Sequence, residues 1–182
     1  MRETVKSDLY RYYGLINTKI YLKGWYLPGF RYTFFLRLAN LYGGTSFFGL
    51  IARLFLRRYS IKYGIQIPRG TKIGKGFYIG HFGSIVVNNR CVIGDNCNLA
   101  HNVTIGQENR GEKKGTPTIG NKVWIGTGSV IVGNIKIGNN VLIAPLSFVN
   151  IDIPDNSIVV GNPCKIIPSE KATENYINNI IK

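Results

Sequence analysis

Aliphatic residues recur at every sixth position between residues 67 and 149, with two interruptions. The series comprises Ile67, Ile73, Ile79, Ile85, Ile93, Leu99, Ile105, Ile119, Ile125, Ile131, Ile137, Ile143 and Val149. Glycine or alanine follows most of these positions and allows a tight turn there. An amphipathic helix would instead repeat its apolar positions every three or four residues. The six-residue period therefore predicts a mainly β fold, a parallel β-helix of short strands and turns over residues 64–167.

The same period predicts which side chains stack on one another. Three six-residue units make one triangular coil, so residues one coil apart lie about 4.8 Å from each other, the strand spacing. One predicted column contains Ile79, Leu99, Ile125 and Ile143, and the residues two positions later are His81, His101, Thr127 and Pro145. The two extra residues between Ile85 and Ile93 are expected to bulge outward. The only two histidines of the chain are thus predicted to share one outer corner.

The segment before the repeats, residues 1–63, is rich in aromatic, leucine and arginine residues. Its stretches LPGFRYTFFLRLANLY and SFFGLIARLFLRRYS predict two helices that are separated at Gly43-Gly44. The second helix places four apolar residues near one face at helical spacing: Phe48, Ile51, Leu54 and Phe55. Two interpretations stay open. The segment either packs as a helical cap or subunit contact, or docks on a membrane as a basic aromatic helix.

Two further segments differ from the repeats. The stretch QENRGEKKGTP, residues 107–117, is too polar and glycine-rich for a core and predicts a loop that leaves the solenoid beside a histidine. Such loops commonly bind substrates, although a merely solvated tip is the alternative. At the end of the chain, residues 168–182 are expected to form a short helix that Ser169 caps.

The charge is strongly positive and unevenly distributed. The 182 residues include 23 Lys and Arg against 9 Asp and Glu, which gives a formal net charge of +14. Residues 1–62 carry 11 of the basic residues and 2 of the acidic ones. This excess is compatible with an anionic membrane surface, nucleic acid, an acidic ligand or an ordinary solvated surface.

The cysteines and the apolar runs bear on the cellular compartment. Cys91, Cys97 and Cys164 form no CxxC pair, which argues against a disulfide framework or a zinc ribbon and fits a reducing cytosol. The polar N-terminus does not resemble a signal peptide. The longest uncharged apolar run, between Arg37 and Arg53, is shorter than the about 20 residues of a membrane span. We expect a cytoplasmic protein, peripheral at the inner face of the cell membrane if the aromatic segment binds lipid.

Four segments resemble the hexapeptide-repeat acyltransferases: IGKGFYIGH, VIGDNCNLAHNVTIG, VWIGTGSVIVGNIKIG and GNPCKII. The branch they resemble contains serine acetyltransferase and its relatives that O-acetylate bacterial surface polysaccharides. The resemblance implies a left-handed β-helix, a homotrimer and acetyl-CoA as the acyl donor. It implies no metal. A β-helical carbonic anhydrase, which needs three histidines on zinc, is excluded by the two histidines present.

The resemblance also implies roles for individual residues. His81 matches the catalytic histidine of the family, and an imidazole suits a general base that takes the proton of an attacking hydroxyl. Preorganised hydrogen-bond donors would stabilise the oxyanion. His101 is the second candidate, either as the base itself or as a residue that orients the acceptor. A turn residue without a role is the alternative for His101.

Further residues match positions that bind the acyl donor in the family. Gly126, Thr127 and Pro145 match the lining of the acetyl-CoA groove, where small residues let the backbone approach the pantetheine arm. Trp124 either packs against that arm or covers the coil between subunits. Gly161 and Lys165 belong to the motif near the adenosine phosphates, with Lys165 as the phosphate contact.

Two departures from the serine acetyltransferases concern the acceptor. Their aspartate fifteen residues before the catalytic histidine is replaced by Gln66, and their Arg-His pair is replaced by Gly115 and Thr116. A carboxylate site without its cation is implausible.

We therefore expect Gln66 and Thr116 to contact a sugar hydroxyl acceptor, from a capsule, exopolysaccharide or O-antigen unit or its precursor. The alternative is serine O-acetyltransferase of cysteine biosynthesis. A non-catalytic basic binding module is a minor alternative, and nucleic acid is not the partner that we favour.

Overall fold

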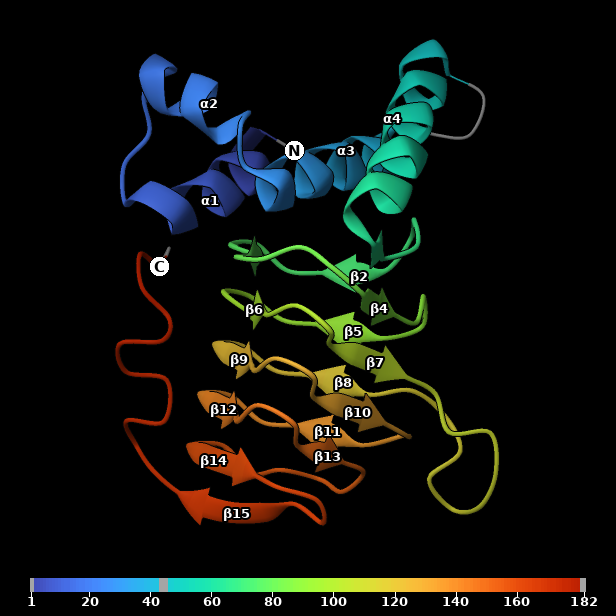
Figure 1. The fold of residues 1–182 in the computed structure, drawn as a ribbon, viewed down its shortest axis with the longest axis vertical. Coiled ribbons are helices and arrows are strands. Elements are labelled where there is room, and N and C mark those ends of the chain that lie inside the picture. The colour runs from blue at the N-terminus through green and yellow to red at the C-terminus, as the bar shows by residue number, and fades with distance from the viewer. Residues whose placement is uncertain (1, 43–45, 181–182) are drawn as a thin grey trace.

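The computed structural model describes residues 2–42 and 46–180, and four helices lie at one end of a stack of β-coils (Figure 1). The helices are α1 (Arg2–Tyr13), α2 (Thr18–Gly24), α3 (Pro28–Leu41) and α4 (Phe47–Tyr63). Asn17 caps α2 by accepting a hydrogen bond from the N–H of Ile20, and Ser46 caps α4 through the N–H of Gly49. The predicted break at Gly43-Gly44 lies outside the described residues. Four helices thus form where the sequence pattern predicted two.

The rest of the chain forms three sheets that run along the sides of a triangular solenoid. The first sheet contains β1 (Ile65–Gln66), β4 (Ile85–Val87), β7 (Thr104–Gly106), β10 (Val130–Val132) and β13 (Phe148–Val149). The second contains β2 (Lys72–Ile73), β5 (Val92–Ile93), β8 (Thr118–Ile119) and β11 (Lys136–Ile137). The third contains β3 (Tyr78–Ile79), β6 (Asn98–Leu99), β9 (Val123–Ile125), β12 (Val141–Ile143), β14 (Ser157–Val160) and β15 (Lys165–Pro168).

The strand pairing confirms the predicted parallel β-helix and its register. Ile79 pairs with Leu99, Leu99 with Ile125, and Ile125 with Ile143, which is the predicted column. The pairs between named strands are parallel except that of β14 with β15, which is antiparallel and ends the solenoid. The architecture agrees with the left-handed β-helix of the hexapeptide-repeat family.

The extra residues lie at a different place from the one predicted. Val87, and not Ile85, pairs with Ile105, so the insertion falls between Ile79 and Val87. The prediction was wrong because Ile85 and Val87 are both apolar and both buried, and the sequence pattern cannot distinguish them. The additional residues therefore widen the corner that carries His81.

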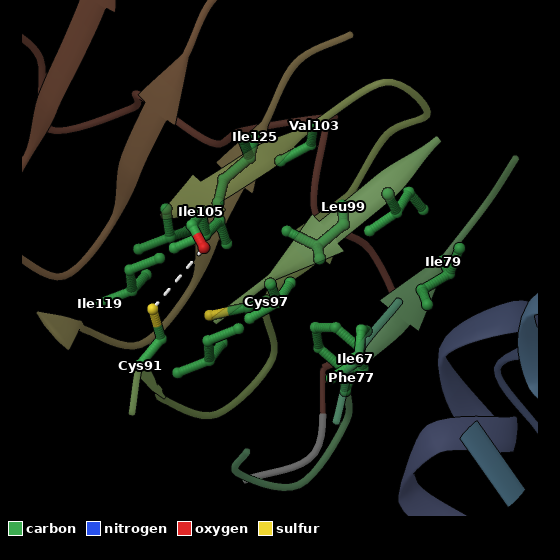
Figure 2. Packing of buried hydrophobic residues seen from close by; sticks show 14 of the residues in the cluster. Ile67, Phe77, Ile79, Cys91, Cys97, Leu99, Val103, Ile105, Ile119 and Ile125 are labelled. Carbon is green, nitrogen blue, oxygen red and sulfur yellow. Dashed lines mark hydrogen bonds between the residues drawn. The ribbon is translucent and has the colours of Figure 1, made fainter. Parts of the chain in front are cut away.

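Aliphatic side chains fill the interior of the coils (Figure 2). Ile79, Leu99 and Ile125 are at most 1% exposed. Figure 2 shows Cys91 and Cys97 among them, and the thiol of Cys91 points to the carbonyl of Ile105 at 3.8 Å. Burial raises the pKa of Cys91 to about 11 and that of Cys97 to about 12. These thiols are core groups and not reactive ones.

The helix α4 packs on the protein through a face other than the one formed by its predicted apolar residues. Gly49, Ala52 and Leu56 are buried, because the small side chains of Gly49 and Ala52 let α4 approach the rest of the protein closely. The four residues predicted to share a face point mainly to solvent: Phe48, Leu54 and Phe55 are exposed and Ile51 is half-buried. None of the helices within residues 2–42 and 46–180 has the length and apolar composition needed to cross a bilayer.

The C-terminal segment forms successive turns and not the short helix expected over residues 168–182, of which 181 and 182 are not described. Asn175 and Asn179 adopt positive φ values of 64° and 53°, which interrupt a right-handed helix. The segment runs back along the coils toward α1 (Figure 1), where Arg11 Nε donates to the carbonyl of Asn178 at 2.9 Å. It is therefore a strap between the last coil and the helices.

The loop over residues 107–117 leaves the solenoid as predicted (Figure 1). Glu108 and Gly115 close its base through two backbone hydrogen bonds of 2.9 Å. The loop follows β7, however, and so departs at the corner after the one that carries the histidines. The expected position beside a histidine was wrong for a single chain, because β7 separates His101 from the loop.

Candidate active site

The two histidines meet at one corner of adjacent coils, as the register predicted. His81 follows β3 and His101 follows β6, and their ring centroids lie 6.0 Å apart with the rings nearly perpendicular. The strand pair Ile79 and Leu99 sets this alignment. The N–H of Asn102 also donates to the carbonyl of Gly83 at 2.9 Å, which holds the two corners together.

A shallow pocket of about 420 Å³ surrounds the histidine pair. Its lining consists of Pro28, Gly80, His81, Phe82 and His101. Pro28 is the first residue of α3, so the helical segment forms one wall of the pocket. Phe82 lies in the widened corner and contacts the ring of Tyr63, with centroids 5.5 Å apart. The pocket therefore combines two imidazoles with an apolar wall.

Sequence reasoning missed Pro28 and Phe82. Phe82 carried a weak signal in the sequence, because it is a large apolar residue directly after the catalytic candidate His81. In the structure its side chain is 53% exposed. Pro28 carried none, since it reaches the pocket only through the packing of α3 on the first coil. Both residues narrow the space in which an acceptor could approach the rings.

Within the described residues, Nδ1 of His101 is buried and has no hydrogen-bond partner. A buried polar nitrogen usually has a partner, and a bound molecule can supply one. A neutral imidazole donates through one nitrogen and accepts through the other, so such a ring can orient a hydroxyl or take its proton. The arrangement suits proton transfer from an alcohol.

The two residues expected at the acceptor lie elsewhere in the single chain. Gln66 is in β1, is exposed, and lines a separate groove with Arg53, Arg57 and Arg69. Thr116 is half-buried and follows the base of the loop over residues 107–117. Neither residue lines the histidine pocket of the chain.

The outer corner that carries His81 and His101 continues on the next coils with Thr127 and Pro145. We call these four stacked positions the ladder, and they lead to the residues expected to bind the acyl donor. Gly126 and Pro145 lie on adjacent coils, and a Cβ atom added to Gly126 would lie 2.6 Å from the nitrogen of Pro145. The N–H of Leu146 donates to the carbonyl of Thr127 at 2.9 Å. Small side chains and closely stacked backbone thus line this corner.

The remaining donor-site candidates lie away from the ladder. Trp124, on the outer face of β9, contacts Tyr176 of the C-terminal strap, with ring centroids 4.9 Å apart. Gly161 opens the turn between β14 and β15 with φ 94°, and Lys165 begins β15 with an exposed side chain. The structure therefore places Gly161 and Lys165 together at the last coil.

The part of the chain that the structure describes contains no group of three or more His, Cys, Asp and Glu side chains able to hold a metal ion.

Comparison with known proteins defines the class. The family described as bacterial transferase hexapeptide (six repeats) matches residues 116–150. The serine acetyltransferase of Helicobacter pylori is 33% identical over 144 residues, which cover 79% of this chain and 84% of that protein. The serine acetyltransferase of Synechococcus elongatus is 35% identical over 118 residues, or 65% of this chain and 48% of that protein.

Solved structures agree with these relatives. The serine acetyltransferase of Brucella abortus superposes with a TM-score of 0.78 at 28% identity and covers 92% of this chain and 69% of that one. The serine acetyltransferase of Neisseria gonorrhoeae in complex with serine superposes with a TM-score of 0.74 at 30% identity, covering 91% and 68%.

The chain therefore belongs to the hexapeptide-repeat acyltransferases. Within that class it belongs to the serine acetyltransferase family. It spans about half of the length of the Synechococcus relative and 33% of serine acetyltransferase 4 of Arabidopsis thaliana.

The expectation of a polysaccharide O-acetyltransferase was wrong, because these relatives and structural neighbours are serine acetyltransferases. That expectation rested largely on three positions, Gln66, Gly115 and Thr116, whereas the match to the Helicobacter relative extends over 144 residues.

Proposed function

We propose that this chain is an acetyl-CoA-dependent serine O-acetyltransferase in which His81 is the general base. The observation that carries the proposal is the pairing of His81 and His101 in a pocket on a hexapeptide solenoid. Two relatives support the substrates: the Brucella enzyme has a structure in complex with coenzyme A, and the Neisseria enzyme has one in complex with serine.

His81 would act directly on the acceptor. Its imidazole accepts the proton of the serine hydroxyl as that oxygen attacks the thioester carbonyl carbon. The imidazolium then returns the proton to the departing thiolate, so the ring ends the cycle neutral. His101, which also lines the pocket, is proposed to orient the hydroxyl toward His81. No covalent enzyme intermediate is needed, because the acceptor attacks the donor itself.

The donor would lie along the ladder below the histidines. Gly126, Thr127 and Pro145 have short side chains, so the backbone groups beside them can contact a pantetheine arm. Lys165 at the last coil is proposed to contact the adenosine phosphates, together with the backbone at Gly161. Trp124 is proposed to act mainly through packing, because its ring already contacts Tyr176.

The contacts of Gln66 and Thr116 with the acceptor, and the homotrimer, are predictions made from the sequence. Gln66 and Thr116 lie outside the histidine pocket of one chain, and we propose that they contribute to an acceptor site completed in a homotrimer. A cytoplasmic location fits the three cysteines, which are all free in the structure.

The test is a thiol-release assay with acetyl-CoA and L-serine, using sugars as alternative acceptors. We expect release that depends on serine, and a loss of about 100-fold or more in His81→Ala, the usual contribution of a general base. Arg90→Ala, an exposed substitution in a turn away from the histidines, is the matched control.

Two outcomes would contradict parts of the proposal. Full activity of His81→Ala, with circular dichroism unchanged, would exclude His81 as the base. Binding of coenzyme A without turnover of serine would exclude serine as the acceptor while leaving the donor site intact.

A further inference from the structure

The outward face of α4 carries an apolar stripe that the protein leaves uncovered. Its residues are Phe47, Leu50, Leu54 and Ile61, which are 71%, 50%, 70% and 77% exposed. With 3.6 residues per turn, the spacings of three, four and seven residues place all four on one narrow face. Single exposed apolar residues are normal in soluble proteins, but a continuous stripe marks an interaction surface.

Basic residues flank this stripe on both sides. On the helix, Arg53 and Arg57 border one edge, and Arg58 and Lys62 border the other. The sequence of α4 contains no acidic residue. One hollow of about 480 Å³ lies on the same face and is lined by Leu54, Arg57, Arg58, Ile61 and Lys62. The lining of this hollow is therefore both apolar and cationic.

The packing of α4 fixes which face points outward. Gly49, Ala52 and Leu56 are buried on the opposite side of the helix. The ring of Phe55, at the margin, stacks on Phe35 of α3 with centroids 4.8 Å apart. The stripe is thus not a core face that could turn inward, and its burial requires another molecule.

The charge of the chain indicates what that molecule is. The whole chain has 9 acidic residues against 23 basic ones, so it offers little negative surface to a second copy. Among those acids, Asp8 is buried against Arg37. Asp95 and Asp155 accept backbone N–H groups in the solenoid turns. An anionic lipid surface would instead match both the cations and the apolar stripe.

We infer that the outward face of α4 is a peripheral docking surface for membranes that contain anionic lipids. The apolar stripe enters the interface between headgroups and acyl chains, and the flanking arginine and lysine side chains contact lipid phosphates. Figure 1 shows α4 at the helical end of the molecule, away from the strands β8 to β15, so docking there leaves most of the solenoid in solution. The inference does not depend on the identity of the acceptor.

The test is co-sedimentation of the full chain with vesicles of phosphatidylcholine alone or mixed with phosphatidylglycerol. We expect binding to the mixed vesicles that weakens as salt is raised, and little binding to phosphatidylcholine alone. Leu54→Ser combined with Ile61→Ser should abolish binding. Arg57→Gln combined with Arg58→Gln should weaken it about fivefold per charge removed.

Matched controls come from the solenoid. Ile151→Ser removes an exposed apolar residue, and Arg90→Gln with Lys122→Gln removes two exposed charges, none of them on α4. These variants should bind vesicles as the unaltered chain does. Serine-dependent thiol release is measured on the single variants Leu54→Ser and Arg58→Gln, which do not line the groove of Gln66, and it should stay unchanged in both. This separates the test from that of the proposed function.

Three results would overturn the inference. The first is unchanged vesicle binding of the Leu54→Ser and Ile61→Ser variant, and the second is equal binding to neutral and anionic vesicles. The third is a change in the oligomeric state of that variant, measured by sedimentation, without vesicle binding by the unaltered chain. That last result would assign the stripe to a second copy of the protein.

Discussion

Replacement of Asp8 by alanine is expected to weaken the attachment of the helices to the solenoid severely. Asp8, on α1, contacts Arg37 of α3 with an oxygen-to-nitrogen distance of 3.0 Å, and the two side chains are 1% and 10% exposed. Asp8 also accepts the N–H of Phe77 at 2.8 Å, and Arg37 donates to the carbonyl of Ile73 at 2.6 Å. One buried pair thus joins two helices to the first coil.

The magnitude follows from what the substitution leaves behind. Removal of one partner of a buried ion pair costs about 3–5 kcal/mol, since the remaining charge stays buried without compensation. The N–H of Phe77 loses its acceptor at the same time, which is part of that cost. The double variant Asp8→Ala/Arg37→Leu removes the stranded charge and should recover at least about 1 kcal/mol.

The assay is urea unfolding at a fixed protein concentration. Trp25 reports on the helical segment, because its ring packs on Phe34 with centroids 5.1 Å apart. In a Trp124→Phe background, where Trp25 is the one remaining tryptophan, fluorescence should therefore show the helical transition at lower urea in Asp8→Ala. Glu3→Ala, an exposed substitution on the same helix, is the matched control and should change stability by less than about 0.5 kcal/mol.

The reasoning is refuted if Asp8→Ala costs no more than Glu3→Ala. The single variant Arg37→Leu completes the cycle. The reasoning is also refuted if the double variant loses more free energy of unfolding than Asp8→Ala and Arg37→Leu lose together, because the coupling would then have the wrong sign.

Two further predictions concern the solenoid. Gly126→Ala should destabilise the protein by about 1–3 kcal/mol, because its Cβ would lie 2.6 Å from the nitrogen of Pro145 on the next coil. Gly106→Ala is the matched control, since its Cβ would meet only the side chains of Val132 at 3.4 Å and Thr104 at 3.8 Å, which are ordinary contacts. Equal urea midpoints of the two variants would contradict the close approach at Gly126. At about pH 8, iodoacetamide should label half-buried Cys164 and spare Cys91 and Cys97, whose pKa values are raised to about 11 and about 12. Labelling of all three cysteines in the folded chain would contradict their burial. Unfolded thiols lose their protons near pH 9 and the two buried thiols keep theirs, so the free energy of unfolding should fall as the pH rises above about 9.

The six-residue period by itself determined the solenoid and most of its register. Each unit repeats the same short contact between a strand and the coil below it, so local spacing carries the information. For that reason the column from Ile79 to Ile143 and the meeting of His81 with His101 could be predicted.

Only the tertiary structure decided the position of the insertion. Ile85 and Val87 are both apolar, so the sequence does not distinguish them. Only their pairing with strands of adjacent coils shows that the extra residues widen the corner of His81. Likewise Pro28 reaches the histidine pocket only because α3 packs on the first coil. Such contacts join segments that are far apart in the chain, and the six-residue period does not predict them.

The face of α4 shows the same limit. Its aromatic and leucine residues were compatible with a packed face or a docking face, and the structure buries Gly49 and Ala52, which allow the closer approach. The energy of packing depends on how two surfaces fit, which a helix sequence does not contain on its own. The sequence thus determined the repeating scaffold and the chemistry of its corner, while the packing of the helices and the strap decided what surrounds that corner and which face stays open.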